Sequence, residues 1–376
     1  MFGNFVLVRV RRVVMESKNY IQLIMRTLET VYPNYLKKRL LNKLADDGLI
    51  INSKRISSKG QLSMITDVSF IDDINRKFQK ILDVDTDNTC FKYVEEFEFT
   101  KEYRHVSYFQ IANFSIDKLD ELLIEGRINF FKRDHEMFDV VNSTASKPTI
   151  KRSKDDVYIK FCFLLDNKGE SEKGSIKYVV LAKINVKEEI LEICLDKVSF
   201  DYKTHKDFYA LIIDDVKQQL ENLLNIQITD IDFKAVVNYL KSERDDVAIY
   251  AMKMHRNGTV AYLDAQSNED LVIPILGELQ DFIKQNSELI GKNTETKEIG
   301  QKLEEFIEGI EVKSDLPSVK MIWPKHGIKL GVEHNYKDRS YSFFMYYDEL
   351  GESRERMEYV REYLVDSFSE LNNATT

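Results

Sequence analysis

Between residues 157 and 200 the sequence contains three apolar runs of strand length: Val157-Tyr-Ile-Lys-Phe-Cys-Phe-Leu-Leu165, Ile176-Lys-Tyr-Val-Val-Leu-Ala-Lys-Ile-Asn-Val186 and Ile190-Leu-Glu-Ile-Cys-Leu-Asp-Lys-Val-Ser-Phe200. β-Branched and aromatic residues are frequent in them, and short polar segments separate them, which is typical of strands joined by turns. Helical patterns follow at about Lys206–Asn225 and at Phe233–Ser242. Three antiparallel strands backed by a helix predict a compact α+β unit.

The alternation of strand and helix patterns continues to the C-terminus. The predicted strands there are Val247–His255, Thr259–Leu263, Val319–Trp323, Ile328–Glu333 and Tyr341–Tyr347, and the predicted helices are Glu278–Ile290, Thr296–Ile310 and Ser353–Phe368. Asn257-Gly258 joins the first two strands, and this dipeptide is typical of a tight β-hairpin. We therefore expect a second antiparallel α+β unit.

The region before Pro148 has shorter patterns. Phe91–Phe99 and Val106–Phe114 read as β-like runs, and Ser115–Glu125 reads as a helix. A polar loop around Pro148 indicates a domain boundary. We therefore expect an α+β protein in four parts: a small basic helical head at residues 1–85, a small α+β linker domain at 86–148, an antiparallel α+β domain at 149–245 and a C-terminal α+β domain at 246–376.

The charge is distributed unevenly, although the net charge is −9 over 376 residues. Residues 1–80 hold 15 Lys and Arg against 7 Asp and Glu, a net of +8, whereas the other 296 residues hold 39 against 56, a net of −17. Met15 is a second candidate start, and omitting residues 1–14 still leaves +5 in the head. A basic head on an acidic body predicts that the head contacts a polyanion.

Three helical patterns occupy the head, at residues 17–32, from Pro33 to about Ala45, and at Ile71–Leu82. In the second helix one face is apolar, with Leu36, Leu40, Leu41 and Leu44, and the other carries Lys38, Arg39, Asn42 and Lys43. Gly48 is a helix C-cap signal, and a short strand at 49–51 follows it. The next turn is basic and contains Lys54, Arg55 and Lys59, and residues 61–68 predict a second strand.

The basic-faced helix, Gly-Leu-Ile and basic turn resemble the recognition helix and wing of a winged-helix domain, over residues 17–68. The resemblance implies a helix in the major groove, with Asn42 or Arg39 at base edges and Lys and Arg side chains on phosphates. Only two helices fit before Gly48, one fewer than in a typical winged helix. We expect a non-enzymatic nucleic-acid-binding protein that uses Lys38, Arg39, Asn42, Lys43, Lys54, Arg55 and Lys59.

Two other interpretations stay open. The basic head can equally dock on protein, either on this chain's own acidic body or on an acidic partner. The chain would then be a structural or interaction subunit of a larger assembly, or a homo-oligomer. The pairs Asp155-Asp156 and Asp245-Asp246 precede predicted strands, and with the Glu311-Val-Lys313 fragment they would suit a metal-dependent nuclease.

Several familiar chemistries have no motif in the sequence. No phosphate-binding loop, dinucleotide-binding glycine motif or nucleophile elbow has the required spacing, so we expect no cofactor. None of the six histidines pairs with another at i,i+4 or neighbours a cysteine, so we expect no metal. Three scattered cysteines fit a reducing compartment, and no apolar run approaches the ~18 residues of a membrane helix. We expect a soluble, cytoplasmic protein that contacts no membrane.

The segment Tyr341-Ser-Phe-Phe-Met-Tyr-Tyr347 is unusually aromatic. In a strand, Tyr341, Phe343, Met345 and Tyr347 would share one face. Such a row can stack on nucleic-acid bases or form an interface hot spot, while core packing is the simpler interpretation.

Overall fold

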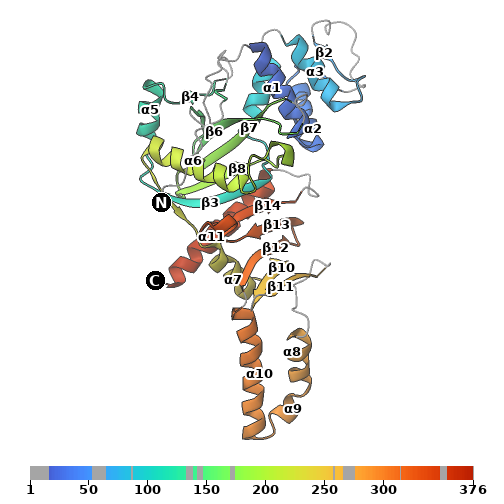
Figure 1. Ribbon diagram of the computed structural model, residues 1–376, viewed down its shortest axis with the longest axis vertical. Helices are drawn as coiled ribbons and strands as arrows, with labels where there is room; N and C mark the ends of the chain where they lie inside the picture. The colour runs from blue at the N-terminus through green and yellow to red at the C-terminus, as the bar shows by residue number, and fades with distance from the viewer. Residues whose placement is uncertain are drawn as a thin grey trace. The chain divides into compact units, whose positions relative to one another are not determined.

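The computed structural model describes residues 17–52, 65–85, 88–132, 139–141, 147–169, 174–256, 259–265, 276–313, 315–347 and 354–375. The fold is mixed α+β, as the sequence predicts (Figure 1). The chain forms two compact units, residues 1–230 and residues 231–376. The division into four parts stays a prediction.

The first unit is built on a mixed sheet with the strand order β3-β8-β7-β6-β5-β4, and β9 also pairs with β3. Its strands are β3 (His105–Ala112), β4 (Asn129–Phe130), β5 (Thr149–Arg152), β6 (Asp156–Leu165), β7 (Ile176–Asn185), β8 (Ile190–Leu195) and β9 (Gln227–Asp230). All pairs are antiparallel except β4 with β5. The three strands expected between residues 157 and 200 are therefore confirmed as β6, β7 and β8, paired in sequence order.

Helices cover both faces of this sheet. They are α1 (Ser17–Thr30), α2 (Asn34–Asp46), α3 (Ile74–Val84), α4 (Thr89–Phe97), α5 (Ile116–Ile124) and α6 (Phe208–Leu224), with a 3-10 turn at Phe200–Tyr202. On one face, the Tyr178 ring of β7 meets Phe208 of α6 at a centroid distance of 5.6 Å. On the other face, the ammonium of the neighbouring residue Lys177 lies 5.7 Å from the ring centroid of Tyr20, on α1. Because both faces are covered, every residue of β7 except its last is buried.

One predicted strand is wrong. Residues 91–99 read as a β-like run, but Thr89–Phe97 forms the helix α4. Phe91, Val94 and Phe97 recur every three residues and are all buried, which is a helical spacing. Lys92 and Glu95 between them are also buried, and Tyr20, which donates a hydrogen bond to Glu95, lies 75 positions away in the sequence.

The head contains the three helices expected there, with a strand pair between the second and the third. Gly48 has φ +73°, so the expected left-handed C-cap is present, and the Leu49 N–H donates to the Leu44 carbonyl at 2.9 Å. β1 (Ile50–Ile51) and β2 (Thr66–Asp67) pair in parallel. A wing is a β-hairpin, whose strands run antiparallel. The winged-helix detail of the prediction is therefore not confirmed.

The second unit has an antiparallel sheet with the order β11-β10-β12-β13-β14. Its elements are α7 (Phe233–Glu243), β10 (Ala248–Arg256), β11 (Thr259–Asp264), α8 (Leu276–Gln285), α9 (Ser287–Ile290), α10 (Thr294–Lys313), β12 (Asp315–Trp323), β13 (Ile328–Glu333), a 3-10 turn (Tyr336–Asp338), β14 (Phe343–Tyr346) and α11 (Arg354–Thr375). These include the five predicted strands. Asn257-Gly258, predicted to be the β10–β11 turn, lies outside the described residues.

Helices α7 and α11 cover one face of the second sheet. Phe233 of α7 contacts Phe344 of β14 edge to face, with the ring centroids 4.9 Å apart. Tyr363 of α11 contacts Trp323 of β12 in the same way, at 5.6 Å. Trp323 is fully buried and so is Phe344, which makes this face the core of the unit.

Across the described part of the chain, we found no helix with both the length and the apolar character needed to cross a membrane.

Candidate functional site

Helix α2 provides the first four residues of the predicted nucleic-acid site. Pro33 precedes the helix with φ −66°, which suits entry into a helix. The leucines expected on its inner face, Leu36, Leu40, Leu41 and Leu44, are at most 2% exposed. This burial fixes the rotation of the helix, so Lys38 and Asn42, one turn apart, are exposed on its outer surface.

The other two predicted residues of α2 contact the protein itself. The guanidinium of Arg39 donates to Glu102, whose side chain is nearly buried. The Lys43 ammonium lies 5.9 Å from the ring centroid of Tyr93, on α4. Arg39 and Lys43 are therefore directed toward their own unit.

Lys54, Arg55 and Lys59, predicted to lie on the wing, belong to residues 53–64 and are outside the described residues. Asn52 is the last described residue before them.

Helix α3 carries three basic residues that the sequence analysis did not select. Arg76 and Lys80 are exposed, and Lys77 is half-buried, while Phe78 between them is 1% exposed and faces the core. A signal was present, because Arg76, Lys77 and Lys80 fall on the outer side of a helical pattern whose inner side is Phe78, Ile81 and Leu82.

Two hydrogen bonds attach α3 to the rest of the head. The Lys37 ammonium of α2 donates to Asn75 Oδ1 at 2.8 Å. The Lys77 ammonium donates to Asn52 Oδ1 at 2.7 Å. The first bond attaches α3 to α2. The second attaches α3 to Asn52, the residue before the basic segment 53–64.

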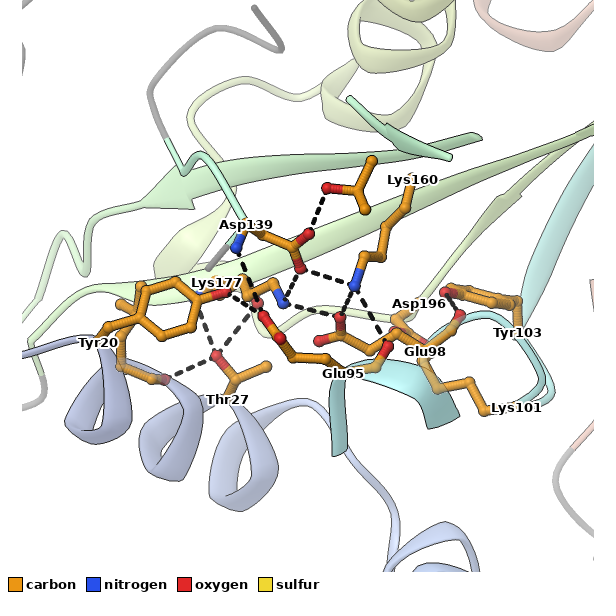
Figure 2. Close-up of polar contacts among 12 residues, drawn as sticks. Tyr20, Thr27, Glu95, Glu98, Lys101, Tyr103, Asp139, Lys160, Lys177 and Asp196 are labelled. Carbon is orange, nitrogen blue, oxygen red and sulfur yellow. Dashed lines mark hydrogen bonds and ion pairs between the residues drawn. The ribbon is translucent and has the colours of Figure 1, made fainter. Parts of the chain in front are cut away.

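A buried ion cluster lies beneath the head, between α1, α4 and the sheet (Figure 2). Lys160 of β6 binds Glu98 at 2.7 Å and Asp139 at 2.6 Å. Lys177 of β7 binds the same two carboxylates at 2.7 and 2.8 Å. All four side chains are at most 4% exposed.

Electrostatic interactions within the cluster shift the pKa values of both lysines and of Asp139. Burial lowers the pKa of Lys160, but the charges of Asp139 and Glu98 outweigh burial and raise this pKa above its usual range. Burial raises the pKa of Asp139. The charges of Lys160 and Lys177 outweigh burial and hold this pKa below its usual range. The two lysines and Asp139 are therefore held in their charged forms, and the four side chains form a closed square of ion pairs.

Glu95 is a third carboxylate beside this square. Its Oε1 accepts a hydrogen bond from the Tyr20 hydroxyl of α1 at 2.9 Å and one from the Asp139 N–H at 3.5 Å. Burial, and then the charge of Asp139, raise the pKa of Glu95 to about 7. The Tyr20 bond connects the first helix of the head to the cluster.

A second buried pair lies next to the cluster. The Lys101 ammonium binds Asp196 and lies 3.5 Å from the ring centroid of Tyr103. Burial lowers the pKa of Lys101 and raises the pKa of Asp196, while each partner opposes that change in the other. The Tyr103 hydroxyl donates to the Glu98 carbonyl at 2.6 Å, which links this pair to the cluster.

The buried cluster holds structural elements together, because its members bind one another and are shielded from solvent. Breaking one partner would leave a buried charge uncompensated, so the arrangement favours one packing of α1, α4, β6 and β7. The sequence analysis missed it, although Lys160 and Lys177 interrupt two otherwise apolar runs and gave a readable signal.

The carboxylates of the nuclease interpretation have separate partners. Asp156 accepts from the Tyr158 hydroxyl at 3.2 Å, and Asp246, in the second unit, accepts from the Tyr363 hydroxyl at 2.5 Å. Glu311 and Lys313 belong to the last turn of α10. Within the described ranges, no group of three or more His, Cys, Asp or Glu side chains is arranged to hold a metal ion.

The sequence was compared with known protein families and with characterised proteins. No family model matches the chain, and no characterised protein matches it either.

Proposed function

We propose that the protein is a non-enzymatic nucleic-acid-binding protein whose basic N-terminal head contacts the phosphate backbone. The observation that carries the proposal is the hydrogen bond from Lys77 to Asn52. It sets the basic side of α3 beside Asn52, the residue before the segment that contains Lys54, Arg55 and Lys59. The acidic remainder of the chain would then bind partners or self-associate.

The exposed residues of α2 and α3 support distinct roles. Lys38, Arg76 and Lys80 are exposed cations, which suits contact with phosphates and a salt-dependent affinity. Asn42, exposed one turn after Lys38, offers an amide that can bond bidentately to adenine. Arg39 could bind a phosphate only after its ion pair with Glu102 breaks, so we do not count it among the direct contacts.

The test is a titration of fluorescein-labelled 20-nucleotide single strands and 20-base-pair duplexes, followed by anisotropy at 50 and 200 mM salt. The double variant Lys38→Glu/Arg76→Glu should weaken binding at least tenfold at the lower salt and reduce the salt slope by about 2. Lys302→Glu is the matched control, because Lys302 is an exposed helical lysine of the second unit with a side chain 69% exposed. Absence of binding at low salt, or equal effects of the two variants, would refute the proposal.

A specific observation also favours protein interaction through the helical arm, residues 276–313 (Figure 1). Its own small core contains Ile283 and Ile307, packed against Leu279, Ile290 and Leu303. Its surface exposes Phe282, Leu289, Ile299 and Phe306, each more than half exposed. Among its described side chains, the arm therefore exposes four large apolar residues and buries two, and exposed apolar surface is typical of an interaction site.

This second candidate has its own test. Phe282→Ser/Phe306→Ser should abolish self-association in sedimentation velocity while leaving nucleic-acid affinity unchanged. If the wild-type protein is monomeric at all concentrations, the homo-oligomer is refuted.

A further inference from the structure

The second sheet has one face that α7 and α11 leave uncovered. Strand alternation separates Val319, Met321 and Trp323 of β12, which are on the covered face, from Lys320 and Ile322. The strand register identifies the residues of neighbouring strands on the same face as Lys320. Lys320 is opposite Ala251 of β10 and Gly331 of β13, so these residues also lie on the uncovered face. Lys253 and Tyr262 are paired on it, as are Gly331 and Met345.

The two faces differ in chemistry and exposure. On the covered face Val319, Met321, Leu330, Val332 and Phe344 are at most 1% exposed. On the opposite face Ile322, Ala251 and Phe343 are also at most 2% exposed, whereas near β11 Tyr262 is 58% and Val260 57% exposed, and Lys253 is also exposed. Lys320, Lys329, Met345 and Tyr347 are half-buried. This face is therefore open toward its β11 edge, among the residues that the structure describes.

Tyrosines and lysines interleave on this open face. The Lys320 ammonium lies 5.3 Å from the ring centroid of Tyr262 and 5.7 Å from that of Tyr347. The Lys329 ammonium lies 5.3 Å from the ring centroid of Tyr250. We call the set Tyr250, Lys253, Tyr262, Lys320, Lys329 and Tyr347 the tyrosine–lysine face.

Gly331 holds one of these rings close to the sheet. A Cβ at Gly331 would come within 2.7 Å of the Tyr347 hydroxyl and 3.3 Å of two ring carbons. Only a residue without a side chain lets the ring lie this near the strand. The aromatic surface therefore depends on the glycine at this position.

We propose that the tyrosine–lysine face binds single-stranded nucleic acid. Bases would stack on Tyr262 and Tyr347, and the lysine ammonium groups would bind the phosphates between them. Asp264 and Glu333 also lie on this face, and the Lys320 ammonium lies 3.9 Å from Asp264, so among the described residues three lysines face two carboxylates. The inference rests on the proposed function and adds a second contact surface and a preference for unpaired strands.

The pattern favours a nucleic acid over a protein partner. Lysine is depleted in the centres of protein interfaces, whereas here lysines lie directly beside the aromatic rings. A duplex keeps its bases stacked on each other, so an open sheet face with exposed rings is suited to unpaired bases. The same charge and ring pattern fits DNA and RNA single strands alike.

The experiment uses the full chain with fluorescein-labelled dT20, rU20 and a 20-base-pair duplex. Tyr262→Ala should raise the Kd for dT20 by roughly 5- to 100-fold, the range expected for losing one stacked base. Tyr262→Phe keeps the ring and should stay within about twofold of wild type. Val260→Ala is the matched control, because Val260 is on the same strand and equally exposed but has no ring.

The outcomes separate this inference from the proposed function. If Tyr262→Ala weakens dT20 binding while Lys38→Glu/Arg76→Glu does not, the sheet face stands and the head assignment fails. If only the head variant weakens binding, the head stands and the sheet face is refuted. Equal losses for Tyr262→Ala and Val260→Ala, or for dT20 and duplex, would also overturn the inference.

Discussion

Lys160 and Lys177, on neighbouring strands, bind the same two carboxylates, Glu98 and Asp139, with all four nitrogen–oxygen distances between 2.6 and 2.8 Å. The carboxylates come from the residue after α4 and from the segment 139–141. Each lysine is 0% exposed, so water contributes little to its charge balance. The hydrophobic core of the first unit therefore contains a buried cluster of ion pairs.

Lys177→Met should be strongly destabilising. The substitution keeps the volume but leaves two carboxylates for one ammonium group, and breaking such a buried pair costs about 3–5 kcal/mol. Lys151→Met is the control, because Lys151 binds Glu96 at 2.9 Å with its side chain 31% exposed, and such a pair contributes about 1 kcal/mol at most. Urea unfolding at pH 7 measures both. Equal losses would show that the square is not ionised.

Glu95 should make the unfolding free energy depend on pH. Its pKa is raised to about 7 in the folded protein, against about 4.3 when unfolded. The folded state thus binds the proton more tightly, so this contribution is complete below pH 4 and is lost as the pH rises to 7. The groups facing Glu95 are Tyr20, Asp139, Lys177, Lys160 and Glu98.

Glu95→Gln tests this dependence. The amide oxygen can still accept from Tyr20, but it carries no proton to lose. Relative to wild type, the variant should gain about 3 kcal/mol between pH 5 and pH 8 in urea unfolding. A difference that does not change with pH would contradict a raised pKa for Glu95.

His105 should produce the opposite dependence. Burial, followed by the charge of Arg104, lowers its pKa to about 3. The unfolded state binds the proton first, so this contribution is present above about pH 6.5 and is lost as the pH falls toward 3. His105→Phe keeps a ring against Tyr209, whose centroid is 4.9 Å away. The variant should lose less stability than wild type between pH 7 and pH 4.5 in urea, and parallel curves would contradict a neutral buried imidazole.

Gly331→Ala should displace the Tyr347 ring, because the new Cβ would meet its hydroxyl at 2.7 Å. We expect a loss of about 1–2 kcal/mol in thermal or urea unfolding, as for other overpacked sites. Gly331→Ala/Tyr347→Ala should recover most of the loss attributable to the clash. If the double variant is as unstable as the sum of the two single variants, the clash is not the cause.

Glu102→Ala should release Arg39, because it removes the side-chain acceptor as well as the charge. If the head binds nucleic acid, the freed guanidinium adds one phosphate contact, so the affinity should rise about two- to fivefold and the salt slope should steepen by about 0.9. Anisotropy titrations at several salt concentrations measure both quantities. Asp46→Asn, at an exposed carboxylate at the end of α2, is the control for the change in net charge. An equal gain in both variants would mean that Arg39 is not involved.

Local patterns gave the strands β6 to β8 and the Gly48 cap, because alternation and a positive φ depend only on neighbouring residues. The same patterns predicted a strand at residues 91–99, which is wrong, because the charged residues there alternate with apolar ones as in a strand although they lie in a helix. The exposed face of α2 could be predicted from the spacing of its leucines. The ion pair of Arg39 could not, because its partner Glu102 is 63 positions away in the sequence. The same limit applies to Lys177, whose partner Glu98 is 79 positions away.

The ionic square also penalises mispairing of β6 and β7. In the native pairing Lys160 is opposite Leu181 and Lys177 is opposite Leu164, which puts both ammonium groups on one side. A slip of one residue would turn Lys177 to the other side, where the Tyr178 ring now contacts Phe208. An apolar pair of strands could tolerate that slip, but a lysine among aromatic rings could not, so the buried charges help to exclude a misfolded form that hydrophobicity alone would permit.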